Sequence, residues 1–533
     1  MAQSSTPNRR EALAALSGAA VLSAADARAE APSTAMTPDA GGIDDLVGRF
    51  MRDFDIPGMA AAIVQPGQAV FLRGYGVRVL GQPARVDVRT QFAIASNSKA
   101  FTTAALAILV DEGKLGWDDP VVKYLPEFRM YDPAVTRMMT VRDLLVHRSG
   151  LPKGAGDLLQ FPRSDRTAED VLRALPYFKP ARGFRAGYAY DNSLYIVAGL
   201  LIGRVSGLSW DAFVAERIFG PLGMVDAVTN PTLPLSDNHA GRHARLGPPV
   251  IGMGPLRVVQ PDETAAIGPA GGINVSVTGI VPWLQVQLGR GVLPDGRRLW
   301  SAAQSDELWK PQTIIASGPG PTPDAPQRSV ITAYALGWGV ADYRGHRALS
   351  HGGGVAGQIT RTALFPDQGI GLAIYSNSQE EEAISALRYA LADRLLGVPT
   401  FDWLAFAHKA RTEAQADAVK AAAGGFTAPP GGPSLPLDRY AGRYRDPWYG
   451  DMLVTLSAAG LAIDFTHTPA LNSALTPFGP DAFRTHFQPG VEDAVVSFAI
   501  KDGAVAGVTL KALSPLADFS FDFQDLAFTP VSH

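Results

Sequence analysis

The chain has 533 residues, of which 46% are hydrophobic, and it contains 55 glycines and 41 prolines. This length and composition suit several globular domains with proper cores and many loops, and they argue against a disordered or fibrous protein. A net charge of −4 offers no broad basic field for nucleic acid, and the lack of cysteine in the sequence excludes disulfides, cysteine-based zinc sites and thiol catalysis.

The first 29 residues have the composition of an export signal. Arg9 and Arg10 precede a weakly apolar, alanine-rich stretch, and Ala27-Arg28-Ala29 is a candidate cleavage site. The apolar run is too short for a membrane span, and no other segment of the sequence is apolar enough for one. The pattern predicts a twin-arginine signal over residues 1–29 and export to a bacterial periplasm. An ordinary amphipathic N-terminal helix is the alternative interpretation.

Apolar runs within residues 42–397 alternate between the period of a strand and the period of a helix. Residues 58–77 predict a β-hairpin around a Pro-Gly turn, residues 92–113 predict an apolar helix, and further helices follow. Consecutive strands are predicted within residues 334–377, before a closing amphipathic helix. Strands at both ends imply one shared sheet, so the pattern predicts an α+β fold with an inserted helical lobe.

The remainder of the chain has a different pattern. Residues 398–436 are predicted to connect two domains, with a Pro/Gly-rich linker over 421–436. Residues 437–533 alternate apolar and polar positions between turn residues, which predicts a small antiparallel β-barrel or a curled sheet.

Segments outside the predicted sheet are expected to shape the site or to assist assembly. Insertions at residues 154–182, 229–263 and 316–329 are expected to form the walls of a pocket. For the C-terminal domain two roles stay open, namely gating of the cleft and assembly of a homo-oligomer.

Lys99 is a misfit in the apolar helix predicted over residues 92–113. Burying an unpaired ammonium group is costly or lowers its pKa. Ser96 lies three residues earlier, so at helical spacing the two side chains share a face. A desolvated lysine is a candidate base for a serine nucleophile. The alternative is a lysine whose amine reaches solvent beside a serine that merely caps the helix.

Two later segments carry further candidate groups. Tyr190 and Asn192 precede an apolar helix, where the simpler interpretation makes Asn192 the N-cap and Tyr190 a packing residue. His351 opens a run of three glycines, 352–354, on a predicted strand. Glycines there allow the close approach of a substrate backbone or an oxyanion, and a simple glycine hairpin is the alternative.

Together and in this order, these elements resemble serine hydrolases of the penicillin-binding protein and class C β-lactamase type, which include D-aminopeptidases, DD-carboxypeptidases and esterases. The three boxes of that family correspond here to Ser96-Asn97-Ser98-Lys99, Tyr190-Asp191-Asn192 and His351-Gly352-Gly353. The resemblance covers residues 42–397 and implies an antiparallel sheet flanked by helices, with neither a cofactor nor a metal. Residues 439–528 are similar to the lipocalin-like β domain appended to some of these hydrolases.

The resemblance implies roles for the first two boxes. Ser96 would be the nucleophile that forms an acyl-enzyme, and Lys99 and Tyr190 would share the role of base. The sequence does not divide that labour between the amine and the phenol. Asn192 would orient Lys99 and the substrate.

The third box departs from the lysine that is usual in β-lactamases. His351 would shape a wall of the site and assist protonation of the leaving group, while Gly352 and Gly353 would line the substrate site. The backbone N–H groups of Ser96 and Gly354 would form the oxyanion hole. A histidine here argues against efficient penicillin hydrolysis, because a fixed positive charge for the substrate carboxylate is missing.

The implied function is an exported serine peptidase or amidase that acts on small peptides, whether D-residue-containing, peptidoglycan-like or similar to linearised microcystin. A carboxylesterase on the same scaffold and a non-catalytic penicillin-binding-type sensor are the alternatives. A Ser-His-Asp hydrolase is disfavoured because the sequence has no G-x-S-x-G elbow. His147 is therefore interpreted as structural. His239 and His243 are at the spacing of a helical metal pair, but a glycine separates them and no carboxylate is near.

Overall fold

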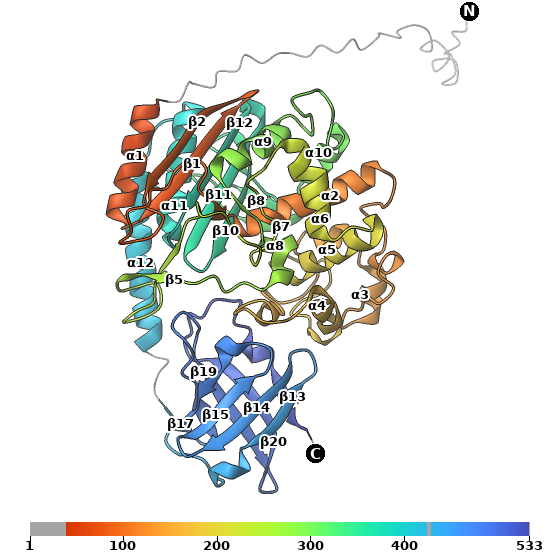
Figure 1. Cartoon of the computed structure of the whole chain (residues 1–533), viewed down its shortest axis with the longest axis vertical. Coiled ribbons are helices and arrows are strands. Elements are labelled where there is room, and N and C mark those ends of the chain that lie inside the picture. The colour runs from red at the N-terminus through yellow and green to blue at the C-terminus, as the bar shows by residue number, and fades with distance from the viewer. Residues whose placement is uncertain (1–38, 424–427, 532–533) are drawn as a thin grey trace, which may run out of the picture. The chain divides into compact units, whose positions relative to one another are not determined.

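The computed structural model describes residues 39–423 and 428–531, so the predicted export signal lies outside the described residues. An eight-stranded antiparallel sheet organises the first domain, in the order β2-β1-β12-β11-β10-β9-β8-β7 (Figure 1). Its strands are β1 (Gly58–Gln65), β2 (Gln68–Gly76), β7 (Thr313–Ser317), β8 (Ile331–Tyr334), β9 (Gly339–Tyr343), β10 (His346–Val355), β11 (Gln358–Phe365) and β12 (Ile370–Ser376).

Strands from the two ends of this domain pair in the middle of the sheet. The predicted hairpin forms β1 and β2, and β1 also pairs antiparallel with β12, with Met59 opposite Ser376. The prediction that both ends of the region share one sheet is therefore confirmed.

The sheet separates two hydrophobic cores. Along β1, Ala60 and Ala62 belong to the core on one face, whereas Met59 and Ala61 belong to the core on the other. This alternation explains why β1 and β12 are apolar at nearly every position, because both of their faces are covered. One face is covered by α1 (Ala40–Asp53), α11 (Glu381–Leu396) and α12 (Trp403–Ala423).

A helical lobe covers the other face, as the sequence predicts (Figure 1). It contains α2 (Lys99–Asp111), α3 (Pro133–Met138), α4 (Ala168–Ala174), α5 (Ser193–Ser206), α6 (Trp210–Val214), α7 (Gly220–Leu222), α8 (Gly268–Gly271), α9 (Val277–Leu288) and α10 (Ala302–Trp309). Two short ribbons join it, β3 (Phe92–Ala93) with β6 (Asn274–Val275) and β4 (Arg242–Arg245) with β5 (Leu256–Val259). Helix α2 is buried on all sides from residue 99 to residue 109.

Residues 398–436, predicted as a connecting segment, contain the 21-residue helix α12. Its first turns carry Trp403 and Ala407 into the core beneath α11, and the indole of Trp403 donates a hydrogen bond of 2.7 Å to Asp393. Few other residues of α12 are buried. The weak apolar periodicity of such a helix is why the sequence pattern did not predict it.

The C-terminal domain is a nearly closed, nine-stranded antiparallel sheet, as predicted. Its order is β16-β15-β14-β13-β21-β20-β19-β18-β17. The strands are β13 (Gly442–Asp446), β14 (Gly450–Ser457), β15 (Gly460–Phe465), β16 (Ser473–Ala474), β17 (Thr476–Gly479), β18 (Ala482–Arg484), β19 (Ala494–Lys501), β20 (Ala504–Ala512) and β21 (Ala527–Pro530). Burial alternates along β15, so one face of each strand packs inside and the other meets solvent.

The described residues of both domains belong to one unit by their contacts. Phe178 of the helical lobe packs edge-on against Trp448, with ring centroids 5.3 Å apart. The backbone N–H of Asp165 donates to the carbonyl of His467 at 3.2 Å. One hydrophobic core runs from the lobe into the C-terminal sheet.

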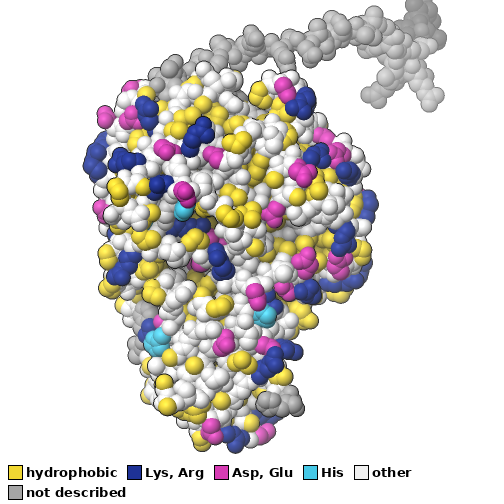
Figure 2. Space-filling model, viewed as in Figure 1, with side chains coloured by type: hydrophobic (Ala, Val, Ile, Leu, Met, Phe, Trp, Pro, Cys, Tyr) yellow, Lys and Arg dark blue, Asp and Glu magenta, His cyan; other side chains and the backbone are white. Residues whose placement is uncertain are grey.

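On the face shown in Figure 2, basic and acidic side chains are interspersed. Among the described residues no single helix has the length and apolarity to cross a bilayer. The helix pair Ser193–Ser206 and Trp210–Leu222, bent by 75°, has the length and composition for a broken span when the two helices are taken together.

Candidate active site

Ser96 lies in a 3₁₀ turn, Ala95–Ser98, that leads from β3 into α2. Ala95 has a φ of 48°, a left-handed conformation that is strained for a residue with a side chain. The side chains of Asn97 and Ser98 hold the turn through hydrogen bonds to β11 and to the segment before β6. Among residues 91–100 only Ser96 is not buried. The turn therefore presents the predicted nucleophile at the surface of the lobe.

Lys99 is fully buried one turn later, and its amine has three hydrogen-bonding neighbours. Its Nζ lies 2.7 Å from Oδ1 of Asn192, 2.8 Å from the carbonyl oxygen of Ala270 and 3.3 Å from Oγ of Ser96. Burial lowers the pKa of Lys99 to about 7, although the carboxyl groups of two nearby aspartates oppose that shift. The sequence alternative of a lysine that reaches solvent is wrong.

Tyr190 meets Ser96 from the segment before α5. Its hydroxyl donates a hydrogen bond of 2.8 Å to Oγ of Ser96. The Nζ atom of Lys99 lies 4.7 Å from the centre of the Tyr190 ring. Burial raises the pKa of Tyr190 well above its usual value, although the hydrogen bond between its hydroxyl and Ser96 acts in the opposite direction. The phenol is therefore protonated at neutral pH, and of these two groups only the amine of Lys99 titrates there.

Asn192 stands at the N-cap position of α5, but its side chain makes no capping hydrogen bond. The neighbouring Asp191 takes that task, because its Oδ1 accepts from the backbone N–H of Leu194 at 3.0 Å. Asn192 is thereby free to accept from Lys99 through Oδ1 and to donate through Nδ2 to both carboxylate oxygens of Asp157, each at 3.2 Å. The simpler interpretation of Asn192 as a helix cap does not describe its contacts.

His351 lies on β10 and is buried, with both ring nitrogens engaged inside the protein. Nδ1 lies 2.6 Å from the carbonyl oxygen of Gly352, which can only accept, so Nδ1 carries the proton. Nε2 then accepts from the hydroxyl of Tyr334 at 2.9 Å. Burial lowers the pKa of His351 to about 3. Because the ring is neutral and its N–H is already hydrogen-bonded, His351 is better suited to form a wall of the site than to give a proton to the leaving group, the role predicted from the sequence.

The glycines that follow His351 have unequal surroundings. A Cβ atom at Gly353 would lie 2.2 Å from the carbonyl oxygen of Ile94, so this glycine lets β10 pack against the turn that carries Ser96. A Cβ atom at Gly352 would meet the guanidinium of Arg361 at 2.8 Å, on the opposite face of the strand. Gly354 is exposed, and a Cβ atom there would lie 3.3 Å from Cδ1 of Ile359. Its N–H stays a predicted oxyanion donor.

Two groups at this site were not predicted from the sequence. Asp157 is fully buried and lies in the insertion at residues 154–182. Burial raises its pKa to about 7, although hydrogen bonds from Asn192 and Ser520 oppose the shift. His147, interpreted as structural, has a φ of 55° and a ring centroid 4.4 Å from that of Tyr190. For Asp157 the sequence held one signal, because this residue is the lone acid in the apolar stretch that holds residues 157–159.

His243, considered with His239 as a metal pair, lies in strand β4 rather than in a helix. Its Nδ1 lies 2.6 Å from the carbonyl oxygen of Asn377, and its Nε2 accepts from the backbone N–H of Leu80 at 3.0 Å. Both ring nitrogens of His243 are therefore committed within the protein.

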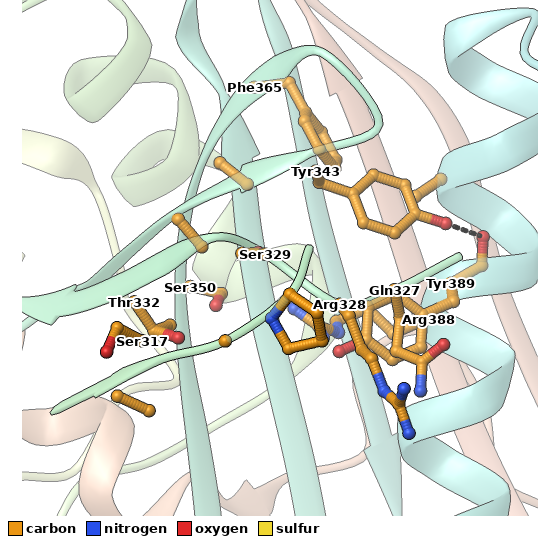
Figure 3. A pocket seen from close by; sticks show the side chains of 16 residues that line it. Ser317, Gln327, Arg328, Ser329, Thr332, Tyr343, Ser350, Phe365, Arg388 and Tyr389 are labelled. Carbon is orange, nitrogen blue, oxygen red and sulfur yellow. Dashed lines mark hydrogen bonds between the residues drawn. The ribbon is translucent and has the colours of Figure 1, made fainter. Parts of the chain in front are cut away.

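A separate cavity of about 460 Å³ lies on the face of the sheet that α11 covers (Figure 3). Alternation along β10 turns Ser350 into this cavity and His351 to the other face. The rest of its lining includes Tyr343, Phe365 and Arg388, together with residues 316–319 and 327–329. The insertion at 316–329, expected as a wall of the pocket, borders this cavity, and the sheet separates it from Ser96.

Comparisons with known proteins show which families and solved structures the chain resembles. The sequence profile of the family described as Beta-lactamase matches residues 43–395, and that of a Domain of unknown function (DUF3471) matches residues 427–530. The Unguisins hydrolase ungD of Aspergillus violaceofuscus (strain CBS 115571) is 29% identical over 470 residues, which span 83% of this chain and 81% of the relative. Protein flp of Staphylococcus aureus (strain MW2) is 26% identical over 343 residues, 64% of this chain and 63% of the relative.

Solved structures share the fold at lower identity. The octameric penicillin-binding protein homologue from Pyrococcus abyssi has a TM-score of 0.56 and 20% identity, and covers 92% of this chain and 100% of its own. The D-amino acid amidase from Ochrobactrum anthropi SV3, complexed with L-phenylalanine, has a TM-score of 0.53 and 21% identity, and covers 67% of this chain and 98% of its own. At these identities the likeness shows the fold.

Proposed function

Since the chain belongs to the beta-lactamase family of serine hydrolases, we propose that it is a peptidase or amidase that cleaves small peptides through an acyl-enzyme on Ser96. The observation that carries the proposal is the set of partners around Lys99. Two of them, the amide oxygen of Asn192 and the carbonyl of Ala270, can only accept hydrogen bonds. The two N–H groups of a neutral amine would satisfy them, so its lone pair would face the hydroxyl of Ser96.

The proposed reaction begins when Lys99 takes the proton of the Ser96 hydroxyl. Oγ then bonds to the substrate carbonyl carbon, and the N–H groups of Ser96 and Gly354 stabilise the oxyanion. The proton held by Lys99 passes through the Tyr190 phenol to the departing amine nitrogen as the amide bond breaks. Water then attacks the acyl carbon, and Lys99 takes the proton of the water and passes it to Oγ of Ser96 as the bond between Oγ and the acyl carbon breaks and the acid leaves. The raised pKa of Tyr190 favours this relay over a phenolate base.

The neutral His351 bears on substrate choice. With its pKa near 3, the ring offers no positive charge to a substrate carboxylate at neutral pH. Penicillins and similar substrates that depend on such a charge should react slowly. Two relatives are named as hydrolases of unguisins, and hydrolysis is the reaction that we infer here.

A substrate panel tests the proposal. D- and L-aminoacyl amides, short peptides, p-nitrophenyl esters and nitrocefin would be offered to the wild type, to Ser96→Ala and to the exposed control Ser457→Ala, with fluorophosphonate labelling of each. We expect turnover of an amide or peptide and labelling in all but Ser96→Ala. Turnover of esters alone would support the esterase alternative, and labelling without turnover would support the sensor. Retained labelling of Ser96→Ala would refute the nucleophile.

Export to the periplasm by the twin-arginine route is a further part of the proposal, supported by Arg9, Arg10 and the alanines near residue 28. Replacing both arginines by lysine should retain the protein in the cytoplasmic fraction. Assembly through the C-terminal domain is also proposed, and light scattering of the purified chain tests it. A monomeric mass would refute the assembly.

A further inference from the structure

A loop of the C-terminal domain, residues 513–522 between β20 and β21, reaches the loop that carries Asp157. Asp522 is buried, with 1% of its surface exposed, and its two carboxylate oxygens accept from the backbone N–H groups of Gly156 and Leu158 at 2.7 and 3.1 Å. The two donors flank Asp157 in the chain. A carboxylate from the second domain thus fixes the backbone of a turn in the first.

The same loop contacts the side chain of Asp157. The hydroxyl of Ser520 donates to Oδ2 of Asp157 at 3.0 Å. Asp157 accepts two hydrogen bonds from Nδ2 of Asn192, whose Oδ1 accepts from Nζ of Lys99 at 2.7 Å. A continuous chain of hydrogen bonds therefore runs from the C-terminal domain to the amine beside Ser96.

Phe519 adds a packing contact beside these hydrogen bonds. Its ring lies edge-on to that of Tyr190, with centroids 6.4 Å apart, and under the amine of Lys153 at 4.0 Å. The φ of Gly154 is 76°, and a Cβ atom there would lie 2.6 Å from the Phe519 ring. The first domain accommodates this side chain only because a glycine faces it.

We propose that Ser520 and Asp522 of the C-terminal domain are positioning residues of the active site, which hold Asp157 and, through Asn192, set the orientation of Lys99. The proposal rests on the proposed function, because it assumes that Lys99 acts as the base for Ser96. It assigns the C-terminal domain a part in the acylation step, beyond gating or assembly.

The charged groups around Lys99 determine the direction in which its pKa should change when this loop is altered. The groups that face Lys99 or Asp157 are Asp191, Asp522, Tyr190, Tyr195, His147 and His351. Two carboxyl groups favour the protonated form of Lys99, that of Asp157 first and that of Asp191 second. Removing the charge of Asp157 should let Lys99 lose its proton at a lower pH. Removing the Ser520 hydroxyl should act in the same direction and less strongly, because Asp157 then ionises less readily.

The test is the rate of fluorophosphonate labelling at Ser96 as a function of pH, in the full chain. We expect Asp157→Asn to shift the acid limb of the profile to lower pH by on the order of one unit. Ser520→Ala should shift it in the same direction by less and slow labelling at the plateau by roughly fivefold, the worth of one hydrogen bond. Ser520→Thr, which keeps the hydroxyl, and Ser457→Ala, on an exposed hairpin of the same domain, should match the wild type.

The outcomes separate this proposal from the proposed function. If the wild type is labelled and Ser520→Ala has the same pH profile of labelling as the wild type, the proposed role of the loop is overturned. A Ser520→Ala variant whose labelling falls only in proportion to its folded fraction, with the acid limb unmoved, would do the same. A wild type that is never labelled at Ser96 would overturn the proposed function, and the positioning role would fall with it.

Discussion

Replacing Gly154 by alanine tests the contact between the two domains at the active site. Gly154 has a φ of 76°, and a Cβ atom there would lie 2.6 Å from a ring carbon and 2.7 Å from the carbonyl oxygen of Phe519. Both distances are too short for carbon, so Phe519 and its loop must move. The variant therefore combines a backbone strain with the displacement of the loop that carries Ser520.

The two effects have separate magnitudes. A side chain in a left-handed conformation costs roughly 1–2 kcal/mol. Overpacking against a buried contact adds roughly 1–3 kcal/mol. Gly154→Ala should therefore lower the free energy of unfolding by about 2–5 kcal/mol. Gly81→Ala is the matched control, because Gly81 has a φ of 79° and no atom within 4 Å of its ideal Cβ position. The free energy of unfolding of Gly81→Ala should fall only by the roughly 1–2 kcal/mol of backbone strain.

Denaturant unfolding gives the stability difference, and fluorophosphonate labelling gives the effect on Ser96. We expect Gly154→Ala to be the less stable variant and to be labelled more slowly, whereas Gly81→Ala keeps the wild-type labelling rate. Equal stability losses and equal labelling rates in the two variants would show that Phe519 does not pack on Gly154 in solution.

Three further predictions follow from the buried charges and hydroxyls. Because burial lowers the pKa of Lys99 to about 7 and its neutral form is the base, kcat/KM should rise with pH through about 7, and a profile flat from pH 5 to 9 would contradict this assignment. Tyr190→Phe should lower kcat by about 10²–10³ with the fold intact, since it removes the hydroxyl that contacts the nucleophile, and steady-state kinetics with circular dichroism measure both. Arg242→Ala should lower the free energy of unfolding by about 3–5 kcal/mol, because it leaves the buried carboxylate of Glu263 unpaired, whereas Arg204→Ala at an exposed ion pair should change it by under about 1 kcal/mol in the same denaturant titration.

Most of the fold could be predicted from local patterns. The hairpin of β1 and β2 is marked by two apolar runs around a Pro-Gly turn, and the second domain by alternation between turns. Helix α12 could not be predicted, because only a few of its residues are buried and so its apolar period is weak. Among the insertions, residues 316–329 gave no sign of which face of the sheet they would cover.

The candidate site was predicted in part. The positions of Ser96, Lys99, Tyr190 and Asn192 were predicted, and the structure brings all four within one hydrogen-bonded group. The division of labour between amine and phenol was open, because a pKa depends on burial and neighbours that the sequence does not show. Whether His351 can protonate a leaving group was open for the same reason. Its donor to Nε2, Tyr334, gave no signal of its own in the sequence.

By itself, the sequence determined the order of the three boxes, the α+β class of the first domain and the β class of the second. These follow from short-range spacing, since a helix or a strand imposes its period on neighbouring residues. Only the tertiary structure decided what surrounds Lys99. Its partner Ala270 is 171 residues away, and Asp157 meets Ser520 across 363 residues. Pairs so distant leave no mark on the local pattern, because no repeat of the backbone relates them. For the same reason, only the tertiary structure shows that Ser520 and Asp522 of the C-terminal domain contact the loop that carries Asp157.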